Sequence, residues 1–422
     1  MRVNIEKLAP TGEGIARTPD GVGFVAGALP GEEVEAEIEE LRKNFWKGRT
    51  TRVHRASPHR VRGPHAACAG CDWGHFDPAQ ALKSKRELFL ETMERIGGQP
   101  AGSFGDLPAE PSPLRYRLRN RFHLSGAGAA TAIGYFVPRT HRVEPLADCD
   151  VVSQETIALL PRFREAIAGT GARVESLTLL ESPDSGQRLV HGLLCPGQTQ
   201  GAARAVLSAI SPLAAGVEVS GAGGGTRLQS GAPTLTITAG GRPFPVSADT
   251  FVQANRHLID KLSEAVRDLA RGVPSGRALD AFGGSGLFGG ALLDAGHTVT
   301  SVEGSRSAVR DAEMAHAIWP DADRWTIVGS DVASFAARQT RDFDLAVLDP
   351  PRAGLGTELS ALLAQRVASR ILYVSCEPAT LARDLPAILS RGFRISAARL
   401  YDLFAATHRI EAIVVLDREG RS

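Results

Sequence analysis

Hydrophobic and polar residues follow three different patterns along the chain. Residues 1–57 contain short alternating stretches broken by glycine turns, which predict a small OB-like β-barrel. Residues 79–96 carry apolar side chains at helical spacing and end at two glycines, so one amphipathic helix is expected there. Between residues 114 and 245 the pattern predicts mixed strands and helices whose order it does not define.

The last part of the chain alternates apolar strands with helices. Strands are predicted at 277–281, 298–302, 343–348 and 370–374. This alternation is typical of a doubly wound, Rossmann-like α/β sheet, in which ligands bind beyond the carboxyl ends of the strands. The expected organisation is a barrel at 1–57, a mixed α+β middle domain at 58–248 and a Rossmann-like domain at 249–422.

Composition and charge narrow the class of protein. The 422 residues are 43% hydrophobic and 23% charged, and no apolar run is long enough to cross a bilayer. The first residues lack the apolar core of a signal peptide, so we expect a cytoplasmic protein, and we expect it to be a monomer. A net charge of +1 gives no general attraction to polyanions, so a nucleic-acid surface must come from local clusters.

Two basic clusters meet that requirement. Residues 41–63 contain Phe45, Trp46 and no acidic residue, together with eight basic ones: Arg42, Lys43, Lys47, Arg49, Arg52, Arg55, Arg60 and Arg62. A second run has arginine at every other position, which would place four guanidinium groups on one face of a strand: Arg115, Arg117, Arg119 and Arg121. Either cluster alone is equally well explained as a solvated surface. Together they favour RNA, bound mainly through its phosphates.

A glycine-rich turn follows the first strand of the last domain and opens a helix. Gly283, Gly284 and Gly286 let a ligand approach the backbone closely, although such a turn serves dinucleotides, nucleotides or tight packing equally well. The next strand ends at Glu303, where a carboxylate binds the ribose hydroxyls of adenosine-containing ligands. Asp331 follows a further strand and is interpreted either as a contact to adenine or as a helix cap.

The motif Asp349-Pro350-Pro351-Arg352 comes directly after another predicted strand. Two prolines cannot continue a central strand, so the chain must leave the sheet with Asp349 at the crevice. The motif resembles that of the RNA 5-methyluridine methyltransferases, and the resemblance extends to the segments 251–255, 374–384 and 407–411. Residues 1–57 resemble the TRAM module, so the resemblance spans essentially the whole chain.

The resemblance implies a class I methyltransferase domain that uses S-adenosylmethionine to methylate C5 of uridine in RNA. The positions that match the methyl-donor-binding residues of the family are Gln253, Phe282, Leu287, Glu303, Asp331 and Asp349. Leu287 stands where the family usually has a small polar residue, so we expect only its backbone to contribute.

Cys376 and Glu411 match the nucleophile and the general base of the family. C5 of uracil is too weak a nucleophile to attack a methylsulfonium directly, and addition of a thiolate to C6 creates an enolate that reacts at C5. Glu411 would then remove the C5 proton. Without the motifs, a buried inert cysteine and a surface glutamate would be the simpler interpretations. The family commonly has histidine where this chain has Arg409.

Three of the five cysteines resemble three of the four ligands of a [4Fe-4S] cluster in many relatives: Cys68, Cys71 and Cys149. The position of the missing cysteine holds Arg62, which cannot coordinate iron, and His65 or His75 is the alternative ligand. We therefore expect a cluster whose fourth ligand is open.

Two other classes of function remain. A dinucleotide-dependent oxidoreductase would explain the glycine turn and Glu303, and a non-catalytic RNA-binding protein would explain the basic clusters. Neither explains Cys376 together with Glu411. Within the preferred class, 23S ribosomal RNA is the expected substrate because the TRAM-like start is combined with a cysteine cluster. The T-loop uridine of tRNA is the competing substrate.

Overall fold

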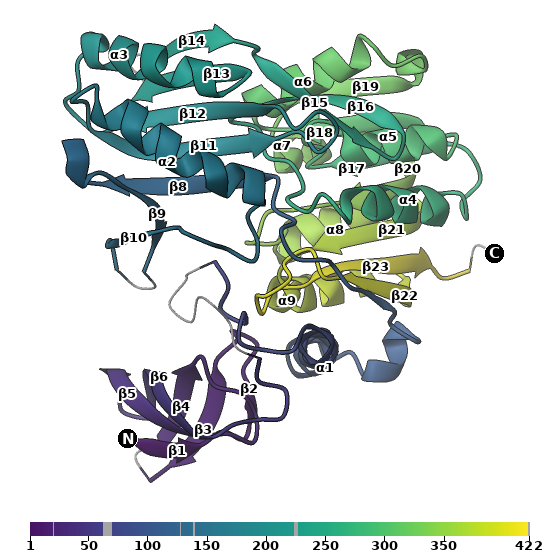
Figure 1. Cartoon of the computed structure of the whole chain (residues 1–422). Helices are drawn as coiled ribbons and strands as arrows, with labels where there is room; N and C mark the ends of the chain where they lie inside the picture. Colours follow the sequence, from purple (N-terminus) through teal and green to yellow (C-terminus); the bar gives the residue numbers. More distant parts are fainter. Residues whose placement is uncertain (20, 62–69, 127, 138–139, 223–226, 421–422) are drawn as a thin grey trace.

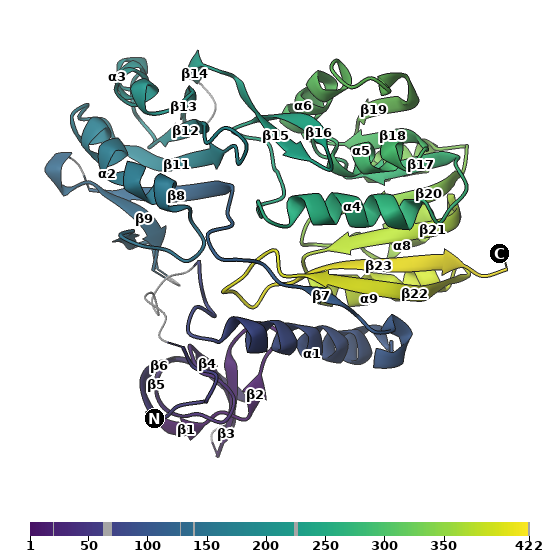
Figure 2. The same ribbon diagram turned by 45° about the vertical axis from the view of Figure 1, so that its right-hand side comes forward.

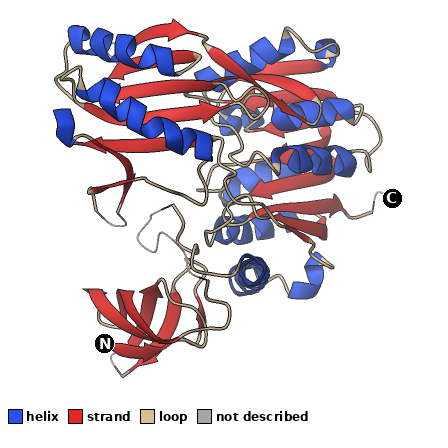
Figure 3. Cartoon of the chain, in the orientation of Figure 1, coloured by secondary structure: helices blue, strands red, loops and turns tan. Residues whose placement is uncertain are grey.

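The computed structural model describes the chain except residues 20, 62–69, 127, 138–139, 223–226 and 421–422. Figure 1 shows three parts, namely an N-terminal barrel, a middle sheet and a C-terminal sheet between helices. The barrel is built of strands, whereas the other two parts combine strands with helices (Figure 3). The predicted fold class is confirmed. The predicted domain boundaries at 57/58 and 248/249 stay a prediction.

The barrel is a six-stranded sheet in the order β1-β5-β6-β4-β3-β2, seen almost end-on in Figure 2. Its strands are β1 (Arg2–Asn4), β2 (Lys7–Leu8), β3 (Gly14–Thr18), β4 (Gly21–Ala26), β5 (Glu33–Leu41) and β6 (Phe45–Arg55). Trp46 fills the core, and a Cβ atom at Gly23 would lie 2.2 Å from its ring, so only glycine fits there. Trp46 is therefore a core residue and is no part of an exposed aromatic surface.

Acidic residues of β5 face the basic strand β6. The antiparallel register pairs Glu37 with Arg49 and Glu35 with Arg52. The guanidinium of Arg49 contacts the carboxylate of Glu37. Part of the basic run, which has no acidic residue in the sequence, thus lies opposite glutamates of a neighbouring strand.

One long helix, α1 (Pro78–Gly97), follows the barrel, which confirms the helix predicted at 79–96. Asp77 caps it by accepting a hydrogen bond from the Gln80 amide at 2.9 Å, and Gly98 ends it in the left-handed conformation. Its apolar face packs against helix α9 (Pro378–Leu389) in the C-terminal part. A Cβ atom at Gly97 would lie 2.9 Å from the carbonyl oxygen of Ala382, so the two helices approach closely.

The middle sheet has seven strands in the order β10-β9-β8-β11-β12-β13-β14. They are β8 (Arg119–Ser125), β9 (Ala132–Phe136), β10 (Val143–Pro145), β11 (Val174–Glu181), β12 (Arg188–Leu194), β13 (Gly216–Gly221) and β14 (Arg227–Gly231). Two helices, α2 (Gln154–Ala168) and α3 (Gln200–Ile210), share an apolar core with one face of this sheet.

The arginine run does not form one strand face as predicted. β8 begins only at Arg119, and Arg115 has a φ of 58°, which takes it out of extended geometry. The Arg115 guanidinium donates a hydrogen bond to the Cys149 carbonyl at 3.0 Å and pairs with Asp148 at 3.1 Å. Arg119 and Arg121 alternate with buried residues on β8, so the prediction holds for these two and is wrong for Arg115.

The C-terminal sheet has eight strands in the order β19-β18-β17-β20-β21-β23-β22-β7. They are β7 (Ala109–Glu110), β17 (Arg277–Ala281), β18 (Thr298–Glu303), β19 (Trp325–Gly329), β20 (Phe343–Leu348), β21 (Val367–Ser375), β22 (Phe393–Tyr401) and β23 (Glu411–Arg418). Strands β17 to β21 are parallel, and β23 is antiparallel to both of its neighbours.

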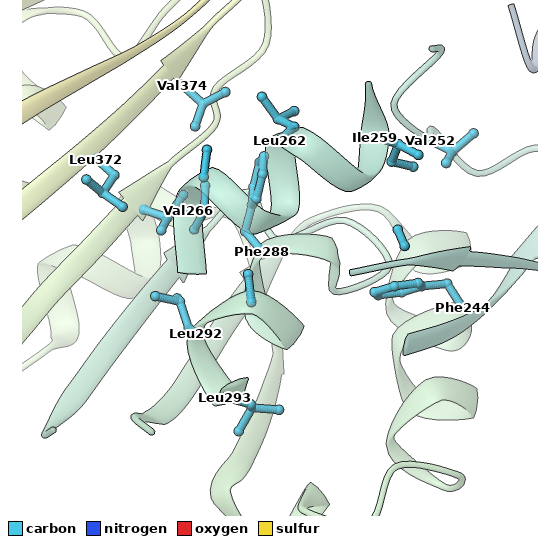
Figure 4. Packing of buried hydrophobic residues seen from close by; sticks show 14 of the residues in the cluster. Phe244, Val252, Ile259, Leu262, Val266, Phe288, Leu292, Leu293, Leu372 and Val374 are labelled. Atoms are coloured by element: carbon cyan, nitrogen blue, oxygen red, sulfur yellow. The ribbon is translucent and has the colours of Figure 1, made fainter. Parts of the chain in front are cut away.

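Helices cover both faces of this sheet. Besides α9 they are α4 (Ile259–Ala270), α5 (Leu287–Asp294), α6 (Arg306–His316), α7 (Val332–Arg338) and α8 (Thr357–Gln365). Figure 4 shows side chains of α4 and α5 packed together with Leu372 and Val374 of β21. Phe244, from the hairpin β15 (Thr234–Ala239) and β16 (Arg242–Ser247), joins the same core.

Short 3-10 turns occupy Ala101–Phe104, Gly128–Ala130, Ser211–Leu213 and Ala322–Arg324. Among the described residues, no helix combines the length and apolar character that crossing a membrane requires.

Candidate active site

The predicted site residues follow neighbouring strands of the C-terminal sheet. Phe282 follows β17 and Glu303 ends β18. Asp349 follows β20 and Cys376 follows β21. Because these strands are parallel, their carboxyl ends meet at one edge of the sheet. Strand β23 runs in the opposite direction, so its first residue, Glu411, reaches the same edge.

The glycine turn between β17 and α5 has an unusual backbone. Phe282 has a φ of 63° although it carries a side chain, a strained conformation that is typical of functional sites. Gly286 has a φ of 103°, and a Cβ atom there would lie 2.6 Å from the Trp325 ring. The Glu303 carboxylate accepts hydrogen bonds from the amides of Gly284 at 3.0 Å and Ser305 at 2.7 Å. The turn is thus held against the end of β18.

A pocket lies against this turn. Four of the six predicted donor-binding residues line it: Gln253, Phe282, Leu287 and Asp349. Three phenylalanines add aromatic surface, and one of them is largely exposed: Phe244, Phe251 and Phe288.

The other two predicted residues lie outside the lining of this pocket. Glu303 reaches it only through its hydrogen bond to Gly284, which is a lining residue. Asp331 is exposed and caps α7, where its carboxylate accepts hydrogen bonds from the amides of Ala333 at 2.9 Å and Ser334 at 3.2 Å. The helix-cap interpretation of Asp331 therefore describes its contacts in the structure.

Carboxyl groups are concentrated beside the pocket. Burial, with the nearby Asp280 carboxyl, raises the pKa of Asp349 to about 7, although Gln253 donates a hydrogen bond to its carboxylate at 3.2 Å. Burial, with the charge of Glu303, raises the pKa of Asp280 to about 7. Among the described residues, one Asp280 carboxylate oxygen has no hydrogen-bond partner, while the other accepts from Ser301 at 2.8 Å. A positively charged ligand would favour the ionised forms of both groups.

Cys376 and Glu411 lie side by side. The register pairs Ser375 with Ala412, so the next residues across the two strands are Cys376 and Glu411. Burial raises the pKa of the Cys376 thiol to about 11, and the Glu411 carboxyl contributes to the shift. Burial, followed by the Asp349 charge, also holds the pKa of Glu411 well above its usual range. The nearby Arg352 guanidinium acts in the opposite direction on both groups.

The loop before Glu411 is fixed by contacts from distant parts of the chain. Lys85 of α1 is buried, pairs with Asp402 and donates a hydrogen bond to the Phe404 carbonyl at 3.2 Å. The Trp73 amide donates to the Ala406 carbonyl at 2.9 Å. Further contacts come from the pair Asp72–His408, from Asn255 to the Leu403 carbonyl, and from Tyr116 to the Ala405 carbonyl.

Two residues of the site received no role from the sequence. Asp280 lies beneath the glycine turn, and a Cβ atom at Gly283 would lie 2.6 Å from its carboxylate. Its place in the glycine-rich motif was the available signal. Arg352 was part of the aspartate-proline-proline-arginine motif, but only the fold shows that it lies near Cys376 and Glu411.

The structure describes two of the three predicted iron–sulfur ligands, Cys71 and Cys149. Cys68, like Arg62 and His65, lies outside the described residues. Cys71 and Cys149 are both buried in the core of the middle sheet. Among the described residues, no group of three histidine, cysteine, aspartate or glutamate side chains is placed to hold a metal ion. The described residues alone therefore do not form the site, and the cluster stays a prediction.

Comparison with known proteins agrees with this geometry. Residues 234–419 match the model of the tRNA (uracil-5-)-methyltransferase family, and residues 1–51 match the TRAM domain. An uncharacterized RNA methyltransferase of Gloeobacter violaceus is 31% identical over 99% of this chain and 96% of its own length. A 23S rRNA (uracil(1939)-C(5))-methyltransferase of Dichelobacter nodosus is 30% identical over 99% of this chain and 98% of its own.

The chain belongs to the RNA uracil-C5 methyltransferase family. It is thus an RNA methyltransferase with an N-terminal TRAM domain, and this decides against the oxidoreductase and the non-catalytic alternatives. The fold also matches a solved structure, the Pyrococcus abyssi tRNA (uracil-54, C5)-methyltransferase in complex with S-adenosyl-L-homocysteine. The TM-score is 0.77, at 21% identity over 99% of both chains.

Proposed function

We propose that this RNA methyltransferase transfers a methyl group from S-adenosylmethionine to C5 of a uridine in 23S ribosomal RNA, through a covalent adduct with Cys376. The observation that carries the proposal is the pairing of Cys376 with Glu411 at the sheet edge where the glycine turn and Asp349 also lie. A thiol beside a buried carboxyl is the pair that addition to C6 and removal of the C5 proton require.

The lining and the charges of the donor pocket suit S-adenosylmethionine. The aromatic lining suits the adenine ring. Glu303, which accepts a hydrogen bond from the lining residue Gly284, is assigned to the ribose hydroxyls. The buried carboxyls of Asp280 and Asp349 suit a ligand that carries positive charge at its sulfonium and ammonium groups. Gln253, Phe282 and the backbone of Leu287 would complete the contacts. Asp331, at the end of the neighbouring strand, is assigned to the adenine edge.

The protein side chains divide the reaction between them. The Cys376 thiolate adds to C6 of uracil, which moves electron density to C5 and O4. C5 then takes the methyl group, and the neutral thioether of the donor leaves. Glu411 removes the remaining C5 proton, so that the C5–C6 double bond re-forms and the thiolate is released. Arg352 favours the thiolate, since a guanidinium beside a thiol stabilises the charged form.

Support for ribosomal RNA comes from the names of full-length relatives, including the Dichelobacter nodosus enzyme. The T-loop uridine of tRNA is the second candidate, because the full-length structural neighbour modifies tRNA at uracil-54. The deciding experiment maps 5-methyluridine in ribosomal RNA and tRNA of a deletion strain and of a complemented strain. Loss at a 23S rRNA position supports the proposal. Loss only in tRNA selects the second candidate, and no loss in either RNA contradicts both.

The proposal includes an iron–sulfur cluster with Cys68, Cys71 and Cys149 as its ligands. Two of these thiols enter one buried core, which suits a shared ligand. Iron and sulfide analysis of protein purified without oxygen tests it. Metal-free protein with normal folding would contradict this part and leave the methyl transfer unaffected.

A further inference from the structure

A second cavity reaches Cys376 and shares no lining residue with the donor pocket. Four parts of the chain form its walls, namely the barrel loop at Pro10, helix α1, the first turn of α9 and the loop that ends at Ile410. The barrel therefore contributes directly to the surroundings of the reactive thiol. None of the predicted donor-binding residues lines this cavity.

Arg409 is the basic residue of this cavity that lacks a close partner. Lys85 is held by Asp402, and His408 is held by Asp72. Within the part of the chain that the structure describes, the Arg409 guanidinium has one ion pair, with Glu377 at 3.9 Å, and no hydrogen bond. Its side chain is 29% exposed. A half-buried guanidinium with five donors and one distant carboxylate is suited to bind an anion.

Arg352 is exposed and lies outside the cavity lining, but it adds a second positive charge that acts on Arg409. The Thr380 hydroxyl donates a hydrogen bond to the Arg352 carbonyl at 3.2 Å, which ties Arg352 to the first turn of α9. The two guanidinium charges repel one another, and both interact with the Cys376 thiol. Two neighbouring guanidinium groups, of which Arg409 has a single ion pair at 3.9 Å, are an arrangement that a phosphate stabilises.

The chemistry of addition brings the sugar-phosphate backbone near this point. A thiol adds to C6 from one face of the pyrimidine ring, and C6 is bonded to N1, the atom that carries the sugar. A cation beside the thiol is therefore close to the phosphates that flank the reacting nucleotide. Contacts of this kind position RNA without reading its sequence.

We infer that Arg409, together with Arg352, forms a phosphate-binding site beside Cys376, which holds a backbone phosphate next to the reacting uridine. The inference rests on the proposed function, because it assigns Cys376 to the attack on C6. The arginine side chain offers a planar, permanently charged fork to a phosphate.

Protection of Cys376 against alkylation tests the inference. The rate of Cys376 carboxamidomethylation is followed by peptide mass spectrometry at increasing concentrations of uridine or of uridine 3′,5′-bisphosphate. The bisphosphate should protect the wild-type protein at a concentration about tenfold lower than uridine does, as expected for a charge-assisted contact. Arg409→Gln should remove most of this advantage, and Arg409→Lys should keep part of it.

A matched control removes one positive charge at a position away from the cavity, on helix α1. Arg95 is exposed in the last turn of that helix and lies outside the cavity lining, so Arg95→Gln should behave like the wild type. An advantage of the bisphosphate that survives Arg409→Gln overturns the inference, and so does equal protection of the wild type by the two ligands. The measurement needs no methyl transfer. A failure to methylate RNA would contradict the proposed function, but the alkylation assay would still show whether Arg409 binds a phosphate.

Discussion

The two sides of the catalytic crevice carry opposite charge. The donor side contains the carboxyls of Asp280, Glu303 and Asp349 around a glycine turn. The thiol side contains the guanidinium groups of Arg352 and Arg409. The two ligands of the proposed reaction differ in the same way, because the donor is a sulfonium cation and RNA is a polyanion. These charges complement those of the two ligands, and Cys376 lies where the two sides meet.

Replacing the nucleophile should show that the two sides bind their ligands independently. We expect Cys376→Ala to abolish methyl transfer, because no C6 adduct forms, and to leave the affinity for S-adenosylmethionine unchanged within about twofold. Transfer of labelled methyl groups to RNA and calorimetric titration with the donor measure the two quantities. A parallel loss of donor affinity would mean that the sides are coupled, and residual methylation would refute the nucleophile.

Replacing the base should stop the reaction one step later. Glu411→Gln keeps the size of the side chain and loses its basicity, so we expect turnover to fall by about 10²–10⁴-fold. Methylated RNA should accumulate while still attached to Cys376, and it should run as a slow band on a denaturing gel. RNA with 5-fluorouridine at the target gives a matched trap with the wild-type enzyme. An adduct on another cysteine would contradict the mechanism.

A change confined to the donor side should affect the donor alone. Glu303→Gln removes one carboxylate from that side, and we expect about tenfold weaker binding of S-adenosylmethionine, in line with a lost charged hydrogen bond. The alkylation rate of Cys376 should not change. Glu313→Gln, at an exposed position of α6, is the control for the loss of one negative charge. Equal effects of the two substitutions would show that Glu303 makes no specific contact.

The smallest expected effect of a substitution concerns Arg352, which acts on the Cys376 thiol. Because the pKa of Cys376 is raised to about 11, the thiolate is a minor form at neutral pH, and the alkylation rate should rise about tenfold for each pH unit between 7 and 10. Arg352 lowers this pKa, so Arg352→Gln should slow alkylation several-fold at pH 8. A rate that is independent of pH would contradict the buried, protonated thiol.

Local patterns in the sequence were sufficient for much of the fold. Asp77 and Gly98 mark the ends of α1 by local capping, and the buried parallel strands are continuous apolar runs. Cys376, Glu411 and Asp349 were recognised because their motifs are short and contiguous. The roles assigned to these residues remain predictions, although the fold brings them to one edge of the sheet.

Features that depend on distant pairing were not predictable. The positive run in β6 looked like a free basic surface because its neutralising glutamates belong to another strand. The alternation of arginines predicted one strand, but Arg115 is bent out of it and donates hydrogen bonds to carbonyl groups. Lys85 and Asp402 form a buried pair across 317 residues, a contact that no local pattern records. The proposed phosphate-binding role of Arg409 follows from the cavity that it lines, which the sequence does not show.

The loop between β22 and β23 has a consequence for how the enzyme is made. It is held by Lys85 and Trp73 and packs against Gly12 of the barrel, where a Cβ atom would lie 2.8 Å from His408. The loop leads directly into Glu411, so the position of this side chain depends on segments that are distant in the sequence. A protein made without residues 10–97 is therefore expected to lose activity. Grafting the C-terminal sheet onto a different RNA-binding module would separate the base from its supports.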